Sequence, residues 1–413
     1  GVDVHVPHLP RTYDGRGDAR AQREARQASE EAGRDLLEQI RGGNVPRPDL
    51  WFSYHVYYKS PDWIGPRIAQ ELRIPYLAAE CSHAPKRAGG PWALGHEGTT
   101  LALSAADRLL AMTAFDRVCL DRLAPGRVRD LKPFIDIAVF GDPSARNNAV
   151  PHLVAVGMMR NDRKRASYAM LAGALRLVAD LPLKLTIAGD GVYRREVEEM
   201  FLPCPSPFEN NKSLVAGEET LSSRKLGEPV AQQRPCETYY PGPRSGAHGA
   251  QSPGSRIADF SVEAYASGKV ASGMTEFYSN GASARLASLH DVTFAGEVPS
   301  DRVPELLNSG DVFVWPGIGE AYGLVFLEAQ AAGLPIVACR DRGVPDVTRE
   351  GETALLSAPG DVAAYAANLR CLLTDHGLGQ RFGVAARAFV HNERSIEAAG
   401  ATLHSVLAEL DLR

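Results

Sequence analysis

The spacing of apolar positions is most informative between residues 311 and 346. Residues 312–315 form a short apolar run typical of a buried strand, and 335–338 form a second one. Between them, a Pro/Gly loop at 316–320 precedes apolar residues at helical spacing, which end at Gly333. The pattern predicts a βαβ unit. A helix that begins on a glycine-flanked loop offers free backbone N–H groups to an anionic phosphate.

The same alternation of strand and helix patterns extends over most of the chain. In the first part we predict strands at 2–6, 50–54, 74–79 and 110–113, and helices at 21–40, 64–72 and 102–109. In the second part we predict strands at 153–156, 183–187 and 292–294, and helices at 168–178, 196–201, 324–332, 362–373 and from 395 onward. Such alternation predicts parallel sheets with helices on both faces.

The stretch from 202 to 283 does not follow this pattern. It is rich in Pro, Gly and Ser and has little periodicity. An unstructured segment of this length is unusual inside a compact domain. Two interpretations stay open, a genuine disordered insertion and a locally corrupted sequence.

Composition narrows the class of protein. With 413 residues the chain is long enough for two domains, and a net charge of −5 gives no general attraction to nucleic acid. No apolar run approaches the roughly 18 residues that span a bilayer. Six scattered cysteines without a C-x-x-C pair favour a reducing, cytoplasmic setting. The chain starts at Gly1 rather than at a methionine, which leaves open that an N-terminal piece is absent.

Two glutamates mark the βαβ unit, Glu320 before the helix and Glu328 within it. At about 1.5 Å per residue, eight steps place them roughly 12 Å apart along the axis. That is too far to flank one glycosidic bond, which needs carboxyl groups about 5 to 9.5 Å apart. The pair could hold opposite ends of one long ligand. The alternative is a capping glutamate and an unrelated solvated one.

The surroundings of these glutamates match a known family. The motif comprises Gly319, Glu320, Tyr322, Gly323, Glu328 and the turn at 333–335. It resembles the Glu-x₇-Glu signature of retaining glycosyltransferases with two Rossmann-like domains (GT-B), and most closely family 4, or group 1, of these enzymes. The resemblance implies that Glu320 faces the hydroxyls of the donor sugar and that Glu328 binds the ribose hydroxyls of the nucleotide.

The resemblance also implies a fold and its division into domains. We expect an α/β protein with two Rossmann-like domains facing a central cleft, an acceptor domain at 1–145 and a nucleotide-sugar domain at 146–390 that carries the insertion 202–283. The tail at 391–413 would pack back on the first domain. In the family, a strand and a Gly-rich loop precede the strand matched by residues 2–6, so we infer that this chain lacks them.

A basic βα loop follows the strand at 153–156. Arg160, Arg163, Lys164 and Arg165 gather there, where parallel sheets bind ligands. Cations at this place can hold a diphosphate and stabilise its charge as it leaves. The resemblance supports Arg160 and Lys164 alone, and a solvated basic turn is the other interpretation.

Further candidates rest mainly on the resemblance. We predict donor contacts from Arg160, Lys164, Gly189, Asp190, Gly296, Gly319, Ala321, Tyr322, Gly323, Leu324 and Glu328. Asp190 could instead cap the next helix. In the first domain, His83 falls where the family often places a histidine near the reacting sugar. His55, Lys86 and Arg87 are candidate acceptor residues, and the two basic ones could meet an anionic acceptor.

The resemblance implies a retaining glycosyltransferase that moves a sugar from a nucleotide-diphospho-sugar to a glycan, a lipid-linked or a small-molecule acceptor. Glu320, His83, Arg160 and Lys164 would be its catalytic residues, and no cofactor or metal is expected. Peripheral association with the cytoplasmic face of a membrane is left open. A catalytically inactive or truncated nucleotide-sugar-binding relative and a nucleotide-sugar epimerase are the alternatives. The Gly-rich fingerprints of dinucleotide-binding dehydrogenases and P-loop NTPases are absent from the sequence.

Overall fold

The computed structural model describes residues 2–141, 148–160, 163–202 and 291–410. The interruption predicted at 202–283 lies outside the described residues, Leu202 excepted. Within the described ranges, none of the helices combines the length and the apolar composition that crossing a membrane would require.

The N-terminal half of the described chain forms a four-stranded parallel sheet. Its strands are β1 (Trp51–Tyr54), β2 (Tyr76–Ala79), β3 (Arg108–Ala111) and β4 (Val128–Asp130), hydrogen-bonded in that order. The helices are α1 (Ala19–Arg41), α2 (Gly65–Leu72), α3 (Ala93–Ala105) and α4 (Ala114–Leu123). Asp18 caps α1 because its carboxylate accepts from the backbone N–H groups of Arg20 and Ala21.

Two predictions for this half are wrong. Residues 2–6 form no strand, and the side chains of Val2, Val4 and Val6 are 72%, 74% and 82% exposed. Alternation alone does not make a strand, since a strand needs a neighbour for its backbone hydrogen bonds. The helix predicted at 102–109 begins earlier and ends at Ala105, because the backbone at Ala106 is already extended and β3 starts at Arg108.

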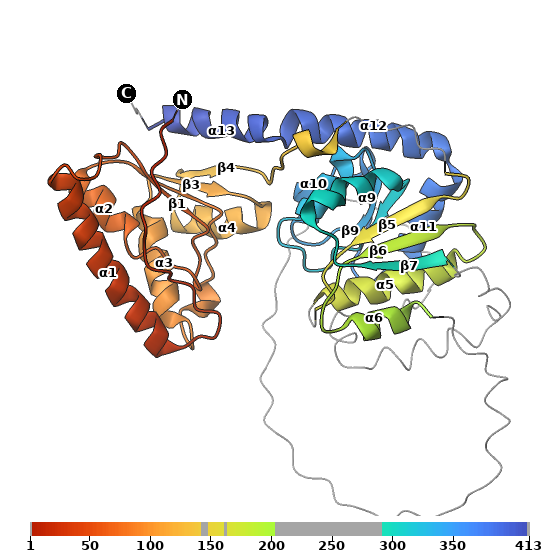
Figure 1. Cartoon of the computed structure of the whole chain (residues 1–413), viewed down its shortest axis with the longest axis horizontal. Helices are drawn as coiled ribbons and strands as arrows, with labels where there is room; N and C mark the ends of the chain where they lie inside the picture. The colour runs from red at the N-terminus through yellow and green to blue at the C-terminus, as the bar shows by residue number, and fades with distance from the viewer. Residues whose placement is uncertain (1, 142–147, 161–162, 203–290, 411–413) are drawn as a thin grey trace, which may run out of the picture. The chain divides into compact units, whose positions relative to one another are not determined.

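The C-terminal half forms a six-stranded parallel sheet in the order β10-β9-β8-β5-β6-β7. The strands are β5 (His152–Val156), β6 (Lys184–Ala188), β7 (Val292–Gly296), β8 (Val312–Val314), β9 (Ile336–Cys339) and β10 (Ala354–Ser357). The helices are α5 (Arg163–Leu177), α6 (Arg194–Met200), α9 (Val303–Ser309), α10 (Leu324–Ala331), α11 (Val362–Thr374), α12 (His376–Glu393) and α13 (Ile396–Ala408). Helices α5 and α6 lie on one side of the sheet and α9 and α10 on the other (Figure 1).

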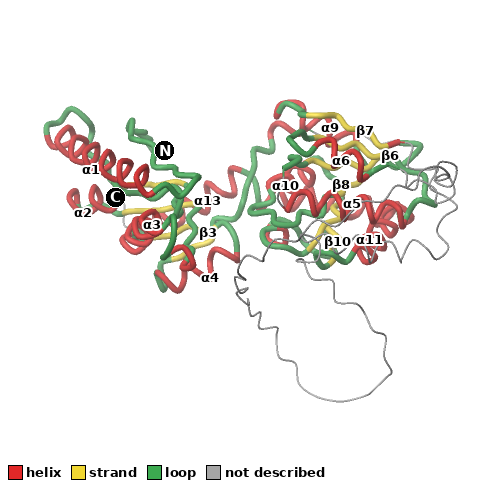
Figure 2. The backbone as a smooth tube through the Cα atoms, turned by 90° about the horizontal axis from the view of Figure 1, so that it is seen from below, coloured by secondary structure: helices red, strands yellow, loops and turns green. Residues whose placement is uncertain are grey.

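The order of the strands creates a switch point in this sheet. From β5 the chain adds β6 and β7 on one side, then returns to place β8 against the other edge of β5. Helices flank both sheets, as the tube view makes clear (Figure 2). In open α/β sheets ligands bind outside the carboxyl ends of the strands at such a point. The loops that follow β5 and β8 are therefore where a ligand is expected.

The last helix packs on the N-terminal sheet. Leu403, Val406 and Leu407 of α13 belong to one apolar cluster with Leu77 of β2 and Leu110 of β3. Glu409, just beyond α13, also accepts hydrogen bonds from Arg108 at 3.0 Å and from Arg129 at 2.8 Å. These ion pairs are exposed to solvent and contribute little to stability, so the apolar contact holds the helix in place.

Candidate active site

The loop after β8 turns sharply on glycine. Gly317, Gly319 and Gly323 have φ angles of 69°, 78° and 70°, which other residues rarely adopt. A Cβ on Gly319 would overlap the side chain of Arg163 at the start of α5. The loop therefore depends on glycine both for its backbone angles and for its close approach to α5.

Two side chains outside this loop accept hydrogen bonds from its backbone, and neither was predicted. The backbone N–H of Ile318 donates to Oγ of Ser167 on α5 at 2.9 Å. The N–H of Gly319 donates to Oδ2 of Asp341, which follows β9, at 2.7 Å. A serine inside a helix and an aspartate after a strand are too common to mark such a role in the sequence.

The structure brings together two of the predicted catalytic residues, Lys164 on α5 and Glu320 in the β8–α10 loop. They form an ion pair, and each side chain is only 17% exposed. The Nζ atom of Lys164 also lies 5.7 Å from the ring centroid of Trp315, a fully buried residue at the end of β8. A half-buried pair is screened less by solvent than a surface pair. A cation and a carboxylate are thus held side by side at the switch point.

Helix α10 begins directly after the glycine loop. Gly323 occupies its N-cap position in the left-handed conformation, and no side chain caps the first turn. Its N-terminal N–H groups and the positive end of the helix dipole are therefore available to an anion. Ala321 and Leu324 beside this turn are exposed, which suits contact with a ligand.

Glu328 lies one turn into α10 and is half-buried. Its carboxylate makes no ion pair or side-chain hydrogen bond with any described residue. Burial raises the pKa of this carboxyl above its ordinary value. A carboxylate held without a partner can accept hydrogen bonds from ligand hydroxyls, and the contact of Glu328 with ribose stays a prediction.

Three neighbouring strands end in glycines that approach one another closely. The N–H of Gly189 after β6 donates to the carbonyl of Gly296 on β7 at 2.7 Å, and Gly157 after β5 donates to Ala188 at 2.9 Å. Gly189 has φ 135°, and a Cβ there would overlap the Gly157 carbonyl. These contacts leave little room for side chains, so a ligand at this edge would meet backbone.

The Asp190 carboxylate makes contacts within its own loop and with α6. Its Oδ1 accepts from the N–H of Gly191 at 2.7 Å, and its Oδ2 lies 3.2 Å from Nη1 of Arg194 on α6. Tyr193, not Asp190, occupies the N-cap position of α6. The aspartate thus braces the loop against the helix, and the alternative of a simple helix cap does not hold.

The four basic residues that follow β5 make different contacts. Arg160 is exposed and its guanidinium contacts Sδ of Met158 at 2.6 Å. Arg163 packs against Gly319, and Arg165 lies 3.6 Å from Glu196 on α6. Of these four residues, Lys164 alone reaches the carboxylate of the glycine loop.

In the N-terminal half, the candidate histidines lie in separate places. Nδ1 of His55, after β1, is 2.8 Å from Oε1 of Glu80, after β2. Nε2 of His83 is 3.2 Å from Oγ1 of Thr100, and its ring centroid is 5.1 Å from that of His96. Burial, reinforced by the neighbouring His96, lowers the pKa of His83, so its imidazole is kept neutral.

The two basic candidates near His83 also differ. Lys86 is exposed, whereas the guanidinium of Arg87 lies over the rings of Tyr58 and Trp92, at 5.1 and 4.9 Å from their centroids. The structure does not bring either of them to His55. Arg87 is therefore occupied by aromatic contacts, which weakens its case as a free anion-binding group.

Sequence reasoning missed Glu80, which is the partner of His55. Glu80 is only 9% exposed, and its backbone φ is 48°, while that of His55 is 63°. Left-handed backbone at non-glycine residues costs about 1 to 2 kcal/mol each and persists where the surroundings enforce it. The single signal in the sequence was an acidic residue directly after a buried strand.

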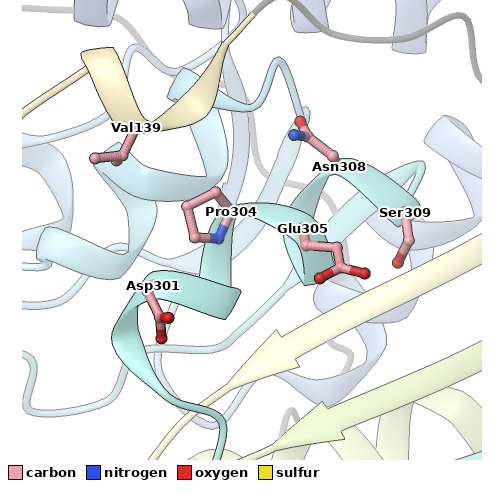
Figure 3. A pocket seen from close by; sticks show the side chains of 6 residues that line it. All are labelled: Val139, Asp301, Pro304, Glu305, Asn308 and Ser309. Atoms are coloured by element: carbon pink, nitrogen blue, oxygen red, sulfur yellow. The ribbon is translucent and has the colours of Figure 1, made fainter.

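A shallow hollow elsewhere on the surface does not coincide with these residues. It is lined by Val139, Asp301, Pro304, Glu305, Asn308 and Ser309. Figure 3 shows that its charged side chains are the carboxylates of Asp301, in the short 3₁₀ helix η5 (Ser300–Arg302), and of Glu305 on α9. An acidic hollow disfavours a phosphate-bearing ligand. In the described part of the chain, no three His, Cys, Asp or Glu side chains gather in a way that could hold a metal ion.

Part of this chain is similar in sequence to a known family. Residues 268–375 match the family model of glycosyl transferases group 1. Sulfoquinovosyl transferase SQD2 of Arabidopsis thaliana is 44% identical over 97 residues, which are 23% of this chain and 19% of the relative. D-inositol 3-phosphate glycosyltransferase of Corynebacterium diphtheriae is 38% identical over 101 residues, 24% of each chain. The matches thus span about a quarter or less of these relatives' length.

Solved structures extend the similarity over most of the fold. A glycosyltransferase from Rickettsia africae superposes with a TM-score of 0.58 at 12% identity, covering 92% of this chain and 80% of the other. Anabaena HepE, solved in complex with UDP, gives 0.55 at 11% identity, covering 92% and 82%. Sucrose-phosphate synthase from Thermosynechococcus elongatus gives 0.54 at 17% identity, covering 94% and 79%.

Together these findings define the class. The fold is the α/β fold of GT-B glycosyltransferases, with two parallel sheets. The segment that contains β8, α10 and β9 lies within the residues that match the model of glycosyl transferases group 1. The predicted fold class and the predicted resemblance to this group are confirmed.

Proposed function

We propose that this protein is a retaining glycosyltransferase that takes a sugar from a nucleotide-diphospho-sugar. One observation carries the proposal, namely the ion pair of Lys164 and Glu320 at the switch point, directly before the uncapped start of α10. A cation suits a diphosphate, a carboxylate suits sugar hydroxyls, and a helix N-terminus suits an anion. Lys164 and Glu320 are in contact, and α10 begins four residues after Glu320.

In this proposal the donor spans the carboxyl edge of the C-terminal sheet. Its nucleoside contacts the backbone around Gly296 and places the ribose at Glu328. The diphosphate meets Lys164 and the start of α10, with Arg160 able to swing in from its exposed position. The sugar then lies against Glu320, where its hydroxyls donate to the carboxylate.

Binding of the donor would weaken the ion pair between Lys164 and Glu320, because each side chain would then also contact one part of the ligand. Lys164 exchanges part of its interaction with Glu320 for the diphosphate, and Glu320 gains hydroxyl donors. The same cation then stabilises the negative charge that grows on the leaving diphosphate as the glycosidic C–O bond breaks. This is the step at which neutralisation accelerates the reaction, and side chain and helix terminus would supply it without a metal.

Retention would follow from attack on the same face. The acceptor oxygen bonds to the anomeric carbon, the leaving phosphate takes the electron pair of the broken bond, and a phosphate oxygen receives the acceptor proton. His83, kept neutral by its buried surroundings, would lie near the reacting sugar. The acceptor would be a carbohydrate, a lipid-linked or a small-molecule alcohol.

The experiment is a screen of nucleotide-sugars against the full chain, with thermal stabilisation and release of nucleoside diphosphate as the two readouts. We expect at least one donor to stabilise the protein and to be turned over. Stabilisation without release would indicate an inactive nucleotide-sugar-binding relative. Interconversion of two nucleotide-sugars without release would indicate an epimerase.

A further inference from the structure

A second polar site lies at the carboxyl ends of β1 and β2, where His55 and Glu80 meet. The strands are neighbours in register, with Tyr54 opposite Ala79, so the residues that follow them emerge side by side. His55 Nδ1 is 2.8 Å from Glu80 Oε1. Both residues have left-handed backbone, φ 63° and 48°. The donor site described above uses neither of them.

The contact fixes the chemistry of the imidazole. A carboxylate can only accept hydrogen bonds, so Nδ1 of His55 must donate. In the neutral ring Nε2 is then an unprotonated acceptor. Among the described residues, Nε2 has no hydrogen-bond partner. The His55 side chain is 45% exposed, whereas that of Glu80 is 9% exposed, so the acceptor atom belongs to the open part of the pair.

Aromatic rings surround this pair. The ring centroids of Tyr54 and Tyr57 lie 6.2 and 4.7 Å from that of His55, and the Tyr54 side chain is largely exposed. Partial burial, with a hydrogen bond to Glu80 and its negative charge, raises the pKa of the Tyr54 hydroxyl to about 12. Tyr54 therefore stays neutral and presents a ring face and a polar edge together.

We infer that His55, oriented by Glu80 and flanked by Tyr54, binds a hydroxyl group of an uncharged, polyhydroxylated acceptor. The inference rests on the proposed function, because it assigns the acceptor side of that reaction. An unprotonated Nε2 accepts a hydrogen bond from an alcohol, and the aromatic rings offer apolar surface to the C–H groups of a polyol. The buried carboxylate behind the ring disfavours an anionic group at the same place.

Glu80 acts through His55 and is thus a positioning residue. It holds the ring in one orientation and one tautomer, as carboxylates do for ligating histidines elsewhere. Tyr322 of the donor loop is a further neighbour of Glu80, because a hydrogen bond between the two contributes to the raised pKa of this tyrosine, after burial and the charges of Glu80 and Asp116. The carboxylate therefore also contacts the loop that carries Glu320.

The test uses two substitutions and a matched control in the full chain. His55→Asn removes the imidazole but keeps a residue type that tolerates left-handed backbone. Glu80→Gln keeps the size and removes the charge that selects the tautomer. Arg73→Asn is the control, because Arg73 also has left-handed backbone, φ 53°, and is exposed at the end of α2.

The first readout compares turnover with nucleotide affinity and requires an active donor. With an active donor, turnover is measured against glycerol, D-glucose and myo-inositol, and nucleoside diphosphate affinity is measured by calorimetry. We expect His55→Asn to lower kcat/KM for the polyol at least tenfold with nucleotide affinity within twofold of wild type, and Glu80→Gln to lower kcat/KM three- to tenfold. Acceptor-dependent turnover within twofold of wild type in both variants would overturn the inference. So would a tenfold loss of nucleotide affinity in His55→Asn, since His55 would then serve the donor.

The second readout does not depend on activity. In ¹⁵N-histidine spectra of the wild type, we expect the His55 signals to report a protonated Nδ1, and titration with a polyol to shift Nε2. Glu80→Gln should give a mixture of tautomers, which a purely structural role would not predict. If no donor is turned over, the proposed function fails and these spectra alone decide. The inference of an uncharged acceptor would be overturned if no polyol shifted the His55 signals. It would also be overturned if glucose 6-phosphate shifted them and the uncharged polyols did not.

Discussion

The loop after β8 and the ends of β1 and β2 both turn through left-handed backbone, but they use different residues. The β8 loop places glycine at each such position, Gly317, Gly319 and Gly323. The ends of β1 and β2 place His55 and Glu80 there. Glycine adopts these angles without strain, whereas a residue with a Cβ is strained by about 1 to 2 kcal/mol. The first region is thus built for close approach of backbone, and the second holds specific side chains at a cost in stability.

This difference predicts where substitution will be most damaging. Gly189→Ala should have the largest effect, because a Cβ there would overlap the Gly157 carbonyl and φ is 135°. We expect the free energy of unfolding to fall by about 3 kcal/mol or more, since backbone has no way to move aside cheaply. Denaturant titration of the full chain measures it.

The control for this substitution is Gly351→Ala. Gly351 has φ 78°, and a Cβ added there would have no heavy atom within 4 Å, so only backbone strain applies. That strain is worth about 1 to 2 kcal/mol. Equal losses for the two variants would show that close approach at the sheet edge contributes nothing.

The second prediction concerns the charged pair in the glycine region. Lys164→Ala should weaken binding of a nucleoside diphosphate by about 1.5 to 3 kcal/mol, the usual worth of a hydrogen bond to a charged group. It also leaves the carboxylate of Glu320 without this cation. Calorimetric titration measures the affinity, and Lys184→Ala, on an exposed lysine at the start of β6, is the control. Affinity like that of wild type would remove Lys164 from the site.

The third prediction separates the two glutamates. Glu328→Gln should weaken binding of free nucleoside diphosphate, by about 1.5 to 3 kcal/mol if the ribose hydroxyls donate to this carboxylate. Glu320→Gln should mainly weaken binding of sugar donors, since its partner would be the sugar. Titration of both variants with both ligands tests this. Equal losses with the free nucleotide would show that the two ends of the donor are assigned wrongly.

The fourth prediction is that Glu328 makes the melting temperature depend on pH. Burial raises its folded-state pKa, so the folded protein binds this proton more tightly than the unfolded chain does. The ionised carboxylate therefore destabilises the fold above the raised pKa, and the effect disappears as pH falls below the unfolded value. Glu328→Gln should raise the melting temperature near pH 7 and lose this advantage near pH 4. An unchanged difference across that range would contradict the argument.

The comparison also explains what the sequence could predict. Glycines with apolar neighbours at helical spacing identified the β8–α10 loop, because the physical requirement and the residue type coincide there. The family resemblance named Lys164 and Glu320 separately, but their ion pair was not predicted, since 156 positions separate them in the sequence. Glu80, Ser167 and Asp341 were missed, because their roles depend on tertiary neighbours.

The N-terminal half shows the limits of reading periodicity. The alternation at 2–6 predicted a strand that the structure does not form, because hydrogen-bonding partners are invisible in a local pattern. The helix α1 was predicted nearly to its ends, since a long amphipathic stripe is a local feature. Strained positions such as His55 leave no local trace, because the same residue is common on ordinary surfaces.

The smallest expected effect tests the strained region most directly. Arg73→Gly should raise the free energy of unfolding by about 0.5 to 1 kcal/mol, because relief of left-handed strain exceeds the entropic cost of glycine. His55→Gly relieves similar strain but loses the hydrogen bond to Glu80, which is worth about 0.5 to 1.5 kcal/mol. Its net change should therefore be close to zero. Denaturant titration compares the two variants. If His55→Gly gained as much as Arg73→Gly, the contact with Glu80 would contribute nothing, and the argument that Glu80 holds the ring would lose its basis.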